Sequence, residues 1–492
     1  MAGGWEEPDP GEVVSLTTDA EWLQLRERYS SDDQAPIVRC LEVARSAGAQ
    51  CAVIETRYLD LDYRSEFSAF YSRAFQAIAN SAHRLHFFRE GLEGEELWCL
   101  PQQLTYLGYM VLRPEPLGVG RTMLVPPPGL AAGVRTGVTE RVTLFGQQLE
   151  VTAVPFMEQD AHLDRCAHTA AWVAHYSAYR RGEVSRRAVA AFSLSADPSL
   201  GYGRPLPSEG LTVQQILEVL RIFDLPAKFY DIEQLPATIS RLPTGQVEEP
   251  PAGLRDPQII SICCRYLNSG YPVLVGTDDH AFVLCGYDRQ VRNGAPDWIR
   301  FLRQDDQVGP YVPIEDVFND QRPDGHAYSP WRYLIVPLPE KLWVVAEHAE
   351  DAGYLFLTQI AQRASAAASD AASLLKLDEH SDLALRTYAR GANDFKRALD
   401  GRVDDVILRE YRLARFPRFV WVVEAVDRSR RRAQDPECVV GEVVFDATSV
   451  YDRPQPLAVH VPGVVMLFGT DGGQRTFRCK PGYYRSGGVG PA

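Results

Sequence analysis

The feature that most constrains this 492-residue chain is a cysteine at the point where a polar segment gives way to a helical pattern. Residues 158–182 read EQDAHLDRCAHTAAWVAHYSAYRRG. The alanine-rich residues after Cys166 favour a helix over 166–181, and Asp164 is suited to be its N-cap. Cys166 would then lie in the first turn, where backbone N–H groups without helical partners favour a thiolate. Small residues on this helix would let it pack closely against a sheet.

Two downstream segments place an imidazole and a carboxylate at strand ends. YPVLVGTDDHAFVLCGYD predicts strands over 272–276 and 281–287, with His280 at the break between them. WIRFLRQDDQVGPY predicts a third strand over 297–304 that stops at Asp305. A neutral histidine can take the proton of a thiol, and a carboxylate can hold the imidazole in one tautomer. We therefore predict Cys166 as nucleophile, His280 as base and Asp305 as the orienting residue, with Asp306 as an alternative to Asp305.

The same chemistry requires hydrogen-bond donors for a developing oxyanion. The backbone N–H of Cys166 is one candidate, and the side chain of Gln159 is the other. Three further histidines compete with His280 for the role of base. His162 precedes the helix and could line a cleft, whereas His175 is too far along the helix axis, and His168 points away from the cysteine around the helix.

Composition narrows the possible partners and the compartment. A net charge of −14 argues against nucleic acid as the main partner, because nonspecific affinity for phosphates comes mostly from Lys and Arg. The basic run at 428–432 is interpreted as a solvated loop. We find no apolar run long enough for a transmembrane helix, and the acidic N-terminus does not resemble a signal peptide. The nine scattered cysteines predict a reducing, cytoplasmic environment, and none of them has the spacing of a zinc site.

The hydrophobic pattern divides the chain into four parts. Residues 1–35 are expected to be a loose N-terminal arm with one short helix, and 36–155 an α+β domain. The suspected catalytic domain spans 156–338, with further helices at 212–223 and 257–268. Residues 339–492 are expected to form a C-terminal α+β accessory domain.

Residues 156–320 resemble the papain-like cysteine peptidase superfamily, and most closely its bacterial C39-like branch. That branch has a glutamine before the cysteine helix, a proline-containing strand that leads to the histidine, and an aspartate at a strand end followed by glycine. The corresponding residues here are Gln159, Cys166, His280, Asp305 and Gly309. Two features depart from the pattern. The glutamine of the branch stands six residues before the cysteine, where this chain has Asp160, and the residue after the cysteine is Ala167 instead of glycine or an aromatic.

The resemblance implies an α+β fold in which a papain-like domain packs the cysteine helix on an antiparallel sheet, between N- and C-terminal α+β domains. It implies a cysteine hydrolase that cleaves a peptide or isopeptide amide through an acyl-enzyme, without a metal or an organic cofactor. The expected partners are a protein or peptide substrate and a protein bound by a flanking domain, but no membrane. Two alternatives stay open: acyl transfer to an amine, as in transglutaminases, and a non-catalytic protein-binding module.

Overall fold

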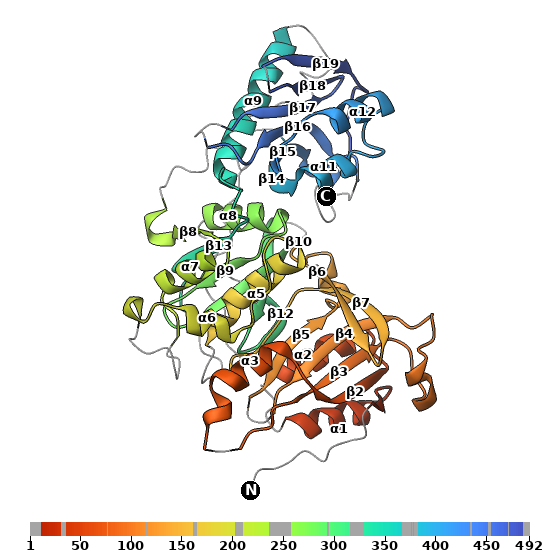
Figure 1. Ribbon diagram of the computed structural model, residues 1–492. Helices are drawn as coiled ribbons and strands as arrows, with labels where there is room; N and C mark the ends of the chain where they lie inside the picture. The colour runs from red at the N-terminus through yellow and green to blue at the C-terminus, as the bar shows by residue number, and fades with distance from the viewer. Residues whose placement is uncertain are drawn as a thin grey trace. The chain divides into compact units, whose positions relative to one another are not determined.

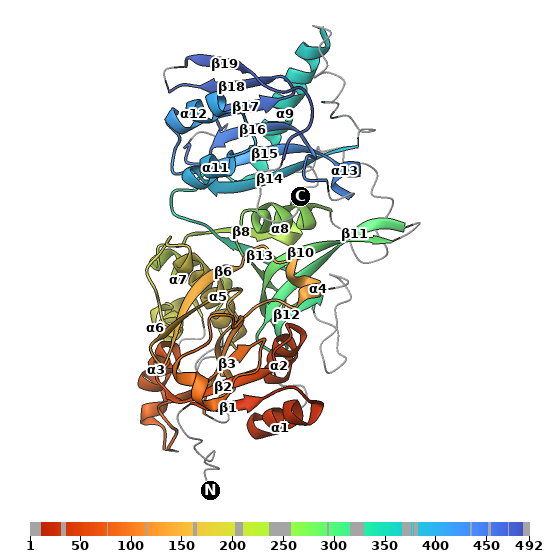
Figure 2. The ribbon, with the colours of Figure 1, turned by 90° about the vertical axis from the view of Figure 1, so that its right-hand side faces the viewer.

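Two structural units make up the chain. The N-terminal unit comprises residues 1–232, 272–289 and 299–338, and the C-terminal unit comprises 233–271, 290–298 and 339–492. The computed structural model (Figures 1 and 2) describes residues 11–30, 36–75, 77–114, 117–160, 165–201, 210–235, 257–292, 295–314, 329–366, 375, 377, 382–432, 435–450, 454–470 and 472–485. The expected α+β class is confirmed, because helices pack on antiparallel sheets in both units.

The N-terminal unit contains a five-stranded antiparallel sheet whose strands follow chain order. They are β1 (Glu12–Ser15), β2 (Cys51–Tyr58), β3 (Ala82–Phe88), β4 (Tyr106–Leu112) and β5 (Val119–Leu124). The helices of the same region are α1 (Asp19–Tyr29), α2 (Pro36–Ser46), α3 (Leu61–Ala69) and the short α4 (Pro128–Ala131).

The described part of the N-terminal arm is not loose. Strand β1 pairs with β2, and Leu16, Trp22 and Leu25 are buried in the core that also holds residues of α2. Helix α1 begins with a capping box between Thr18 and Glu21. Because these apolar side chains lose contact with water only when the segment docks, residues 11–30 belong to the folded unit.

A second sheet of the N-terminal unit carries the segments singled out in the sequence. Its six strands run in the order β12-β11-β10-β9-β13-β8, and each pair whose register is known is antiparallel. The strands are β8 (Ala227–Asp231), β9 (Val273–Gly276), β10 (Ala281–Arg292), β11 (Ala295–Asp305), β12 (Gly309–Ile314) and β13 (Tyr333–Pro337). The hairpin of β6 (Val138–Leu144) and β7 (Gln147–Ala153) turns at Gly146, which has the positive φ such a turn needs.

Helix α5 (Cys166–Arg180) packs beside this sheet, together with α6 (Ala190–Ser195) and α7 (Val213–Ile222). Most of α5 is buried, and the alanines predicted to allow close packing, such as Ala170 and Ala171, lie in the core. A capping box of Thr212 and Gln215 is present at the start of α7. The sequence therefore predicts α5 and α7 to within about two residues at either end, whereas α6 was not expected.

A buried ionic network fixes α5 from the side of the first sheet. The Arg121 guanidinium on β5 lies 2.9 Å from Asp60 and 3.3 Å from Glu140. It also donates to the hydroxyl of Tyr176 on α5 at 2.9 Å. The indole of Trp172, one turn earlier, donates to Asp62 at 3.2 Å. Since each of these buried charges has a partner, the contacts offset its desolvation and define the position of α5.

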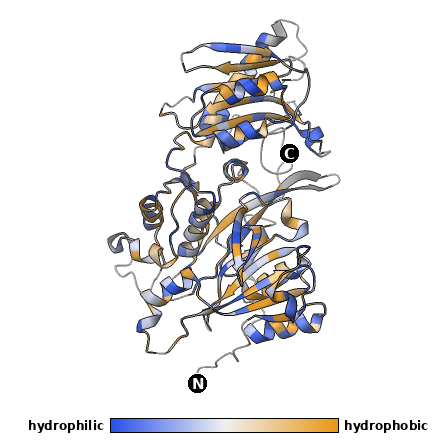
Figure 3. Cartoon of the chain, turned by 45° about the vertical axis from the view of Figure 1, so that its right-hand side comes forward, coloured by the Kyte–Doolittle hydropathy of each residue, from blue (hydrophilic) through white to orange (hydrophobic). Residues whose placement is uncertain are grey.

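The C-terminal unit is built on a six-stranded antiparallel meander. Its strands are β14 (Leu383–Gly391), β15 (Phe419–Asp427), β16 (Val439–Asp446), β17 (Pro456–Val461), β18 (Val464–Phe468) and β19 (Gln474–Arg478). Helix α9 (Ala346–Ala366) covers one face, and α11 (Ala392–Ala398) and α12 (Asp405–Leu413) cover the other (Figures 1 and 2). Much of the hydrophobic sequence lies on the strands (Figure 3).

Helix α8 (Pro257–Asn268), expected inside the 156–338 domain, belongs to the C-terminal unit. The Arg265 guanidinium forms a two-pronged pair with Glu350 of α9 at 2.5 and 3.0 Å. Ser269, just past the helix, accepts a hydrogen bond from the backbone of Ala389 on β14 at 2.8 Å. The expectation followed from the position of α8 in the sequence, between segments of the 156–338 domain. In the structure, α8 packs against α9 and β14.

The basic run at 428–432 is not a loop. It forms the one-turn helix α13 (Arg428–Arg432), which begins after β15. The Arg430 guanidinium stacks on the ring of Tyr483 at 3.6 Å and pairs with Asp435 at 3.2 Å. None of the described helices combines the length and the hydropathy that a membrane span requires.

Candidate functional site

Cys166 is the first residue of α5, and it is half-buried. The N-cap is Arg165, whose backbone N–H donates to Nδ1 of His168 at 3.2 Å. Asp164, predicted to be the N-cap, and His162 lie outside the described residues. The sulfur therefore lies in the first helical turn, where backbone N–H groups favour negative charge.

His280 occupies the last position of the loop that joins β9 to β10. The two strands pair with Ala281 opposite Gly276. Thr277 closes the loop, because its hydroxyl accepts from the backbone N–H of His280 at 3.0 Å and its own N–H donates to the His280 carbonyl at 2.9 Å. The imidazole is fully buried. The loop thus holds the histidine backbone by local hydrogen bonds while the ring points into the unit.

Asp305 ends β11 and lies directly against the imidazole. Its Oδ1 accepts from Nε2 of His280 at 3.0 Å and from the backbone N–H of Gln307 at 3.1 Å. Its Oδ2 lies 3.0 Å from Nε of Arg303, which precedes it by two residues on the same strand. Both carboxylate oxygens are therefore engaged, and the one on the histidine side holds the tautomer with the proton on Nε2.

The cysteine is near enough to the imidazole to affect its electrostatics. Burial alone would lower the pKa of His280, but Asp305 raises that pKa well above its ordinary value, and the Cys166 side chain adds to the rise. Because Nε2 faces Asp305, Nδ1 is the ring nitrogen left for the sulfur. A thiol, an imidazole and a carboxylate from three separate segments thus lie in one region of the unit, and the imidazole and the carboxylate are in direct contact.

Asp306, the alternative to Asp305 in the sequence, lies farther from the ring. Its Oδ1 is 3.8 Å from Nε2 of His280, beyond hydrogen-bonding distance. The pairing of β11 with β12 shifts register between Arg303 and Asp305, where β12 has one residue more than β11. The distances assign the orienting contact to Asp305.

The remaining predicted residues are placed as follows. Gln159 lies half-buried in the segment between β7 and α5, and its side chain makes no hydrogen bond within the described part of the chain. Asp160, at the position where the resembling branch has its glutamine, is buried and accepts from the Tyr71 hydroxyl at 2.6 Å. His168 and His175 are buried core residues, and this burial lowers their pKa values to about 3 and 4. The identity of a side-chain oxyanion donor is thus open between Gln159 and other groups.

Two further residues shape the site without having been singled out in the sequence. Arg303 is completely buried beside Asp305. Because alternate residues of a strand share a face, its position two residues before Asp305 could have predicted that the two side chains lie together. Tyr333 on β13 lies across Gly276, and burial, with a smaller contribution from the charge of Cys166, raises the pKa of this tyrosine to about 12. Tyr333 therefore lies in the neighbourhood of the cysteine.

Replacing Gly276 with alanine is expected to disturb this tyrosine. A Cβ at position 276 would overlap the ring of Tyr333, so the ring or the strand must move. We expect a loss of about 1–3 kcal/mol in the free energy of unfolding, measured by urea denaturation. Gly129→Ala is the matched control, because a Cβ there meets nothing within 4 Å. Equal stability of the two variants would contradict the close packing of Tyr333 on β9.

A metal ion is the other ligand that this cluster of groups suggests. Among the described residues, His280, Asp305 and Asp306 offer ligand atoms within 4.8 Å of one another. However, the Arg303 guanidinium and the Gln307 N–H already bind the two oxygens of Asp305. A cation would have to displace the neighbouring positive charge. The arrangement fits a hydrogen-bonded acid–base group better than a metal centre.

Comparisons with known proteins add no family assignment. No protein-family model, no curated protein and no solved structure matches the chain. The functional argument therefore depends on the geometry around Cys166.

Proposed function

We propose that the chain is a cysteine hydrolase of papain-like architecture, with α5 on the β8–β13 sheet as its catalytic region. One observation carries the proposal: the buried His280 imidazole is held by the Asp305 carboxylate at 3.0 Å, and Cys166, at the start of α5, is near enough to help raise its pKa. A raised pKa of His280 favours the imidazolium, which is the partner of a thiolate nucleophile.

In the proposed reaction, the Cys166 thiolate attacks the carbonyl carbon of a peptide or isopeptide amide and forms a C–S bond. The backbone N–H of Cys166, together with Gln159 or another donor, stabilises the oxyanion. The His280 imidazolium then protonates the leaving nitrogen as the C–N bond breaks. Water, deprotonated by the neutral imidazole, attacks the thioester, which releases the acid and restores the thiol. Asp305 keeps the imidazole oriented through both steps.

The reactivity of individual cysteines tests this proposal. At pH 6 we expect iodoacetamide to label Cys166 at least about tenfold faster than Cys99, with peptide mass spectrometry as the readout. Accessibility alone predicts the reverse, because Cys99 is exposed and Cys166 is half-buried. Slower labelling of Cys166 at pH 6 would indicate a passive thiol, and the fold would then be better explained as a protein-binding module.

A further inference from the structure

A second carboxyl group lies beside the imidazole and has no role in the proposed reaction so far. Asp306 follows the last residue of β11, and it is 5 % exposed. Neither of its carboxyl oxygens makes a hydrogen bond with a described residue. Its Oδ1 lies 3.8 Å from Nε2 of His280. A buried carboxyl without hydrogen bonds is costly, so its presence calls for a physical explanation.

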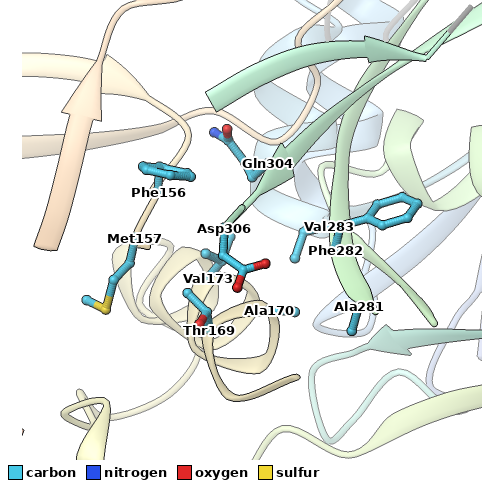
Figure 4. A pocket seen from close by; sticks show the side chains of 10 residues that line it. All are labelled: Phe156, Met157, Thr169, Ala170, Val173, Ala281, Phe282, Val283, Gln304 and Asp306. Atoms are coloured by element: carbon cyan, nitrogen blue, oxygen red, sulfur yellow. The ribbon is translucent and has the colours of Figure 1, made fainter. Parts of the chain in front are cut away.

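The Asp306 side chain points into a small cavity (Figure 4). The cavity has a volume of about 10 Å³, close to the space that one water molecule occupies. Two other polar side chains line it, and both are engaged elsewhere: Thr169 donates to a backbone carbonyl of Arg165, and Gln304 bonds to the backbones of Val154 and Tyr311. The rest of the lining is apolar: Phe156, Met157, Ala170, Val173, Ala281, Phe282 and Val283.

The charged groups around Asp306 come from three segments. Its pKa is raised to about 7, chiefly by burial; the His280 charge opposes this rise, and repulsion from Asp305 and Glu158 adds to it. On α5, the residues that line the cavity are Thr169, Ala170 and Val173, and β10 contributes Ala281, Phe282 and Val283, none of which titrates. Arg303 is paired with Asp305. Of the charges named here, the His280 imidazolium is therefore the one that stabilises an ionised Asp306 carboxylate.

We infer that Asp306 is a positioning residue whose ionised carboxylate stabilises the imidazolium of His280 and so extends the thiolate–imidazolium pair to higher pH. The inference deepens the proposed function and rests on it for the catalytic consequence alone. Below pH 7 the carboxyl is mostly protonated and contributes little. Above pH 7 it ionises, and its negative charge opposes loss of the proton from the ring. The effect therefore grows with pH.

The direct test is an NMR titration of the His280 ring nitrogens in the full chain. Asp306→Asn keeps the shape of the side chain and removes the charge, and we expect it to lower the imidazolium pKa by about one unit or more. The matched control is Asp278→Asn, which removes the same charge from an exposed residue paired with Arg332. We expect that variant to leave the His280 titration unchanged. If Asp306→Asn does not fold, Asp306→Ser makes the same charge change and leaves room for water.

The pH profile of hydrolysis gives the second readout. In Asp306→Asn, the alkaline limb of kcat/KM should move to lower pH, whereas the values below pH 6 should stay close to those of the wild-type protein. A purely structural role would lower the whole profile evenly, and that outcome would overturn the inference, as would an unchanged His280 titration. If no amide is hydrolysed but the titration still shifts, the proposed function fails and the coupling of Asp306 to His280 stands.

Discussion

Replacing Cys166 with alanine is expected to abolish amide hydrolysis, with a loss in kcat of roughly 10⁴-fold or more. The sulfur is the only protein atom that forms a covalent bond with the substrate carbon in the proposed reaction, so no neighbouring group can replace it. Turnover of a fluorogenic peptide library measures the loss. Cys99→Ala is the control, because Cys99 is an exposed cysteine outside the site and its replacement should leave turnover unchanged.

The double variant Cys166→Ala with His280→Ala tests whether the two residues act as one unit. If Cys166 and His280 act as one unit, each single replacement removes nearly the whole effect, and the double variant is about as inactive as either single one. If the two residues contributed independently, the fold-loss in activity of the double variant would be the product of the two single losses. His348→Ala is the histidine control, because that residue is exposed on α9 of the C-terminal unit. Full activity in Cys166→Ala would end the proposed assignment.

Much of the site could be predicted from local sequence patterns. An alanine-rich helix after Cys166 and strands on both sides of His280 are short-range features, and the structure contains them at the expected places. The contact between His280 and Asp305 was predicted because a strand end places a carboxylate next to a neighbouring strand. These predictions succeeded where hydrophobic periodicity and turn residues determine the element.

The features that were missed depend on contacts between distant segments. Helix α8 was assigned to the domain of its neighbours in sequence, but the buried partner of Arg265 is Glu350. Two segments of the N-terminal unit, 272–289 and 299–338, separate these residues along the chain. Both carboxyl groups lie near one ring nitrogen of His280, Asp305 at 3.0 Å and Asp306 at 3.8 Å, and so small a difference in distance is not encoded in a local sequence pattern. Burial is what raises the pKa of Asp306 to about 7, and burial is a property of the folded unit.

Replacing Asp305 with alanine is expected to cost both activity and stability. Asp305 is fully buried and is the partner of two cationic groups, the Arg303 guanidinium and the His280 imidazolium. Its removal leaves both charges buried without this partner, which costs about 3–5 kcal/mol in the free energy of unfolding. Urea denaturation measures this loss, and peptide turnover measures the loss of tautomer control.

Asp305→Asn separates the two effects. The amide keeps the volume of the side chain and can still accept a hydrogen bond from Nε2 or Arg303, so we expect a smaller loss of stability than in Asp305→Ala. Activity should still fall by roughly 10²-fold or more, because a neutral amide does not stabilise the imidazolium. The double variant Arg303→Met with Asp305→Asn should recover part of the stability lost in Asp305→Ala, since no buried guanidinium is then left without its carboxylate. Equal stability of Asp305→Ala and the wild-type protein would mean that water reaches these charges, and the buried, oriented imidazole on which catalysis is argued would not exist.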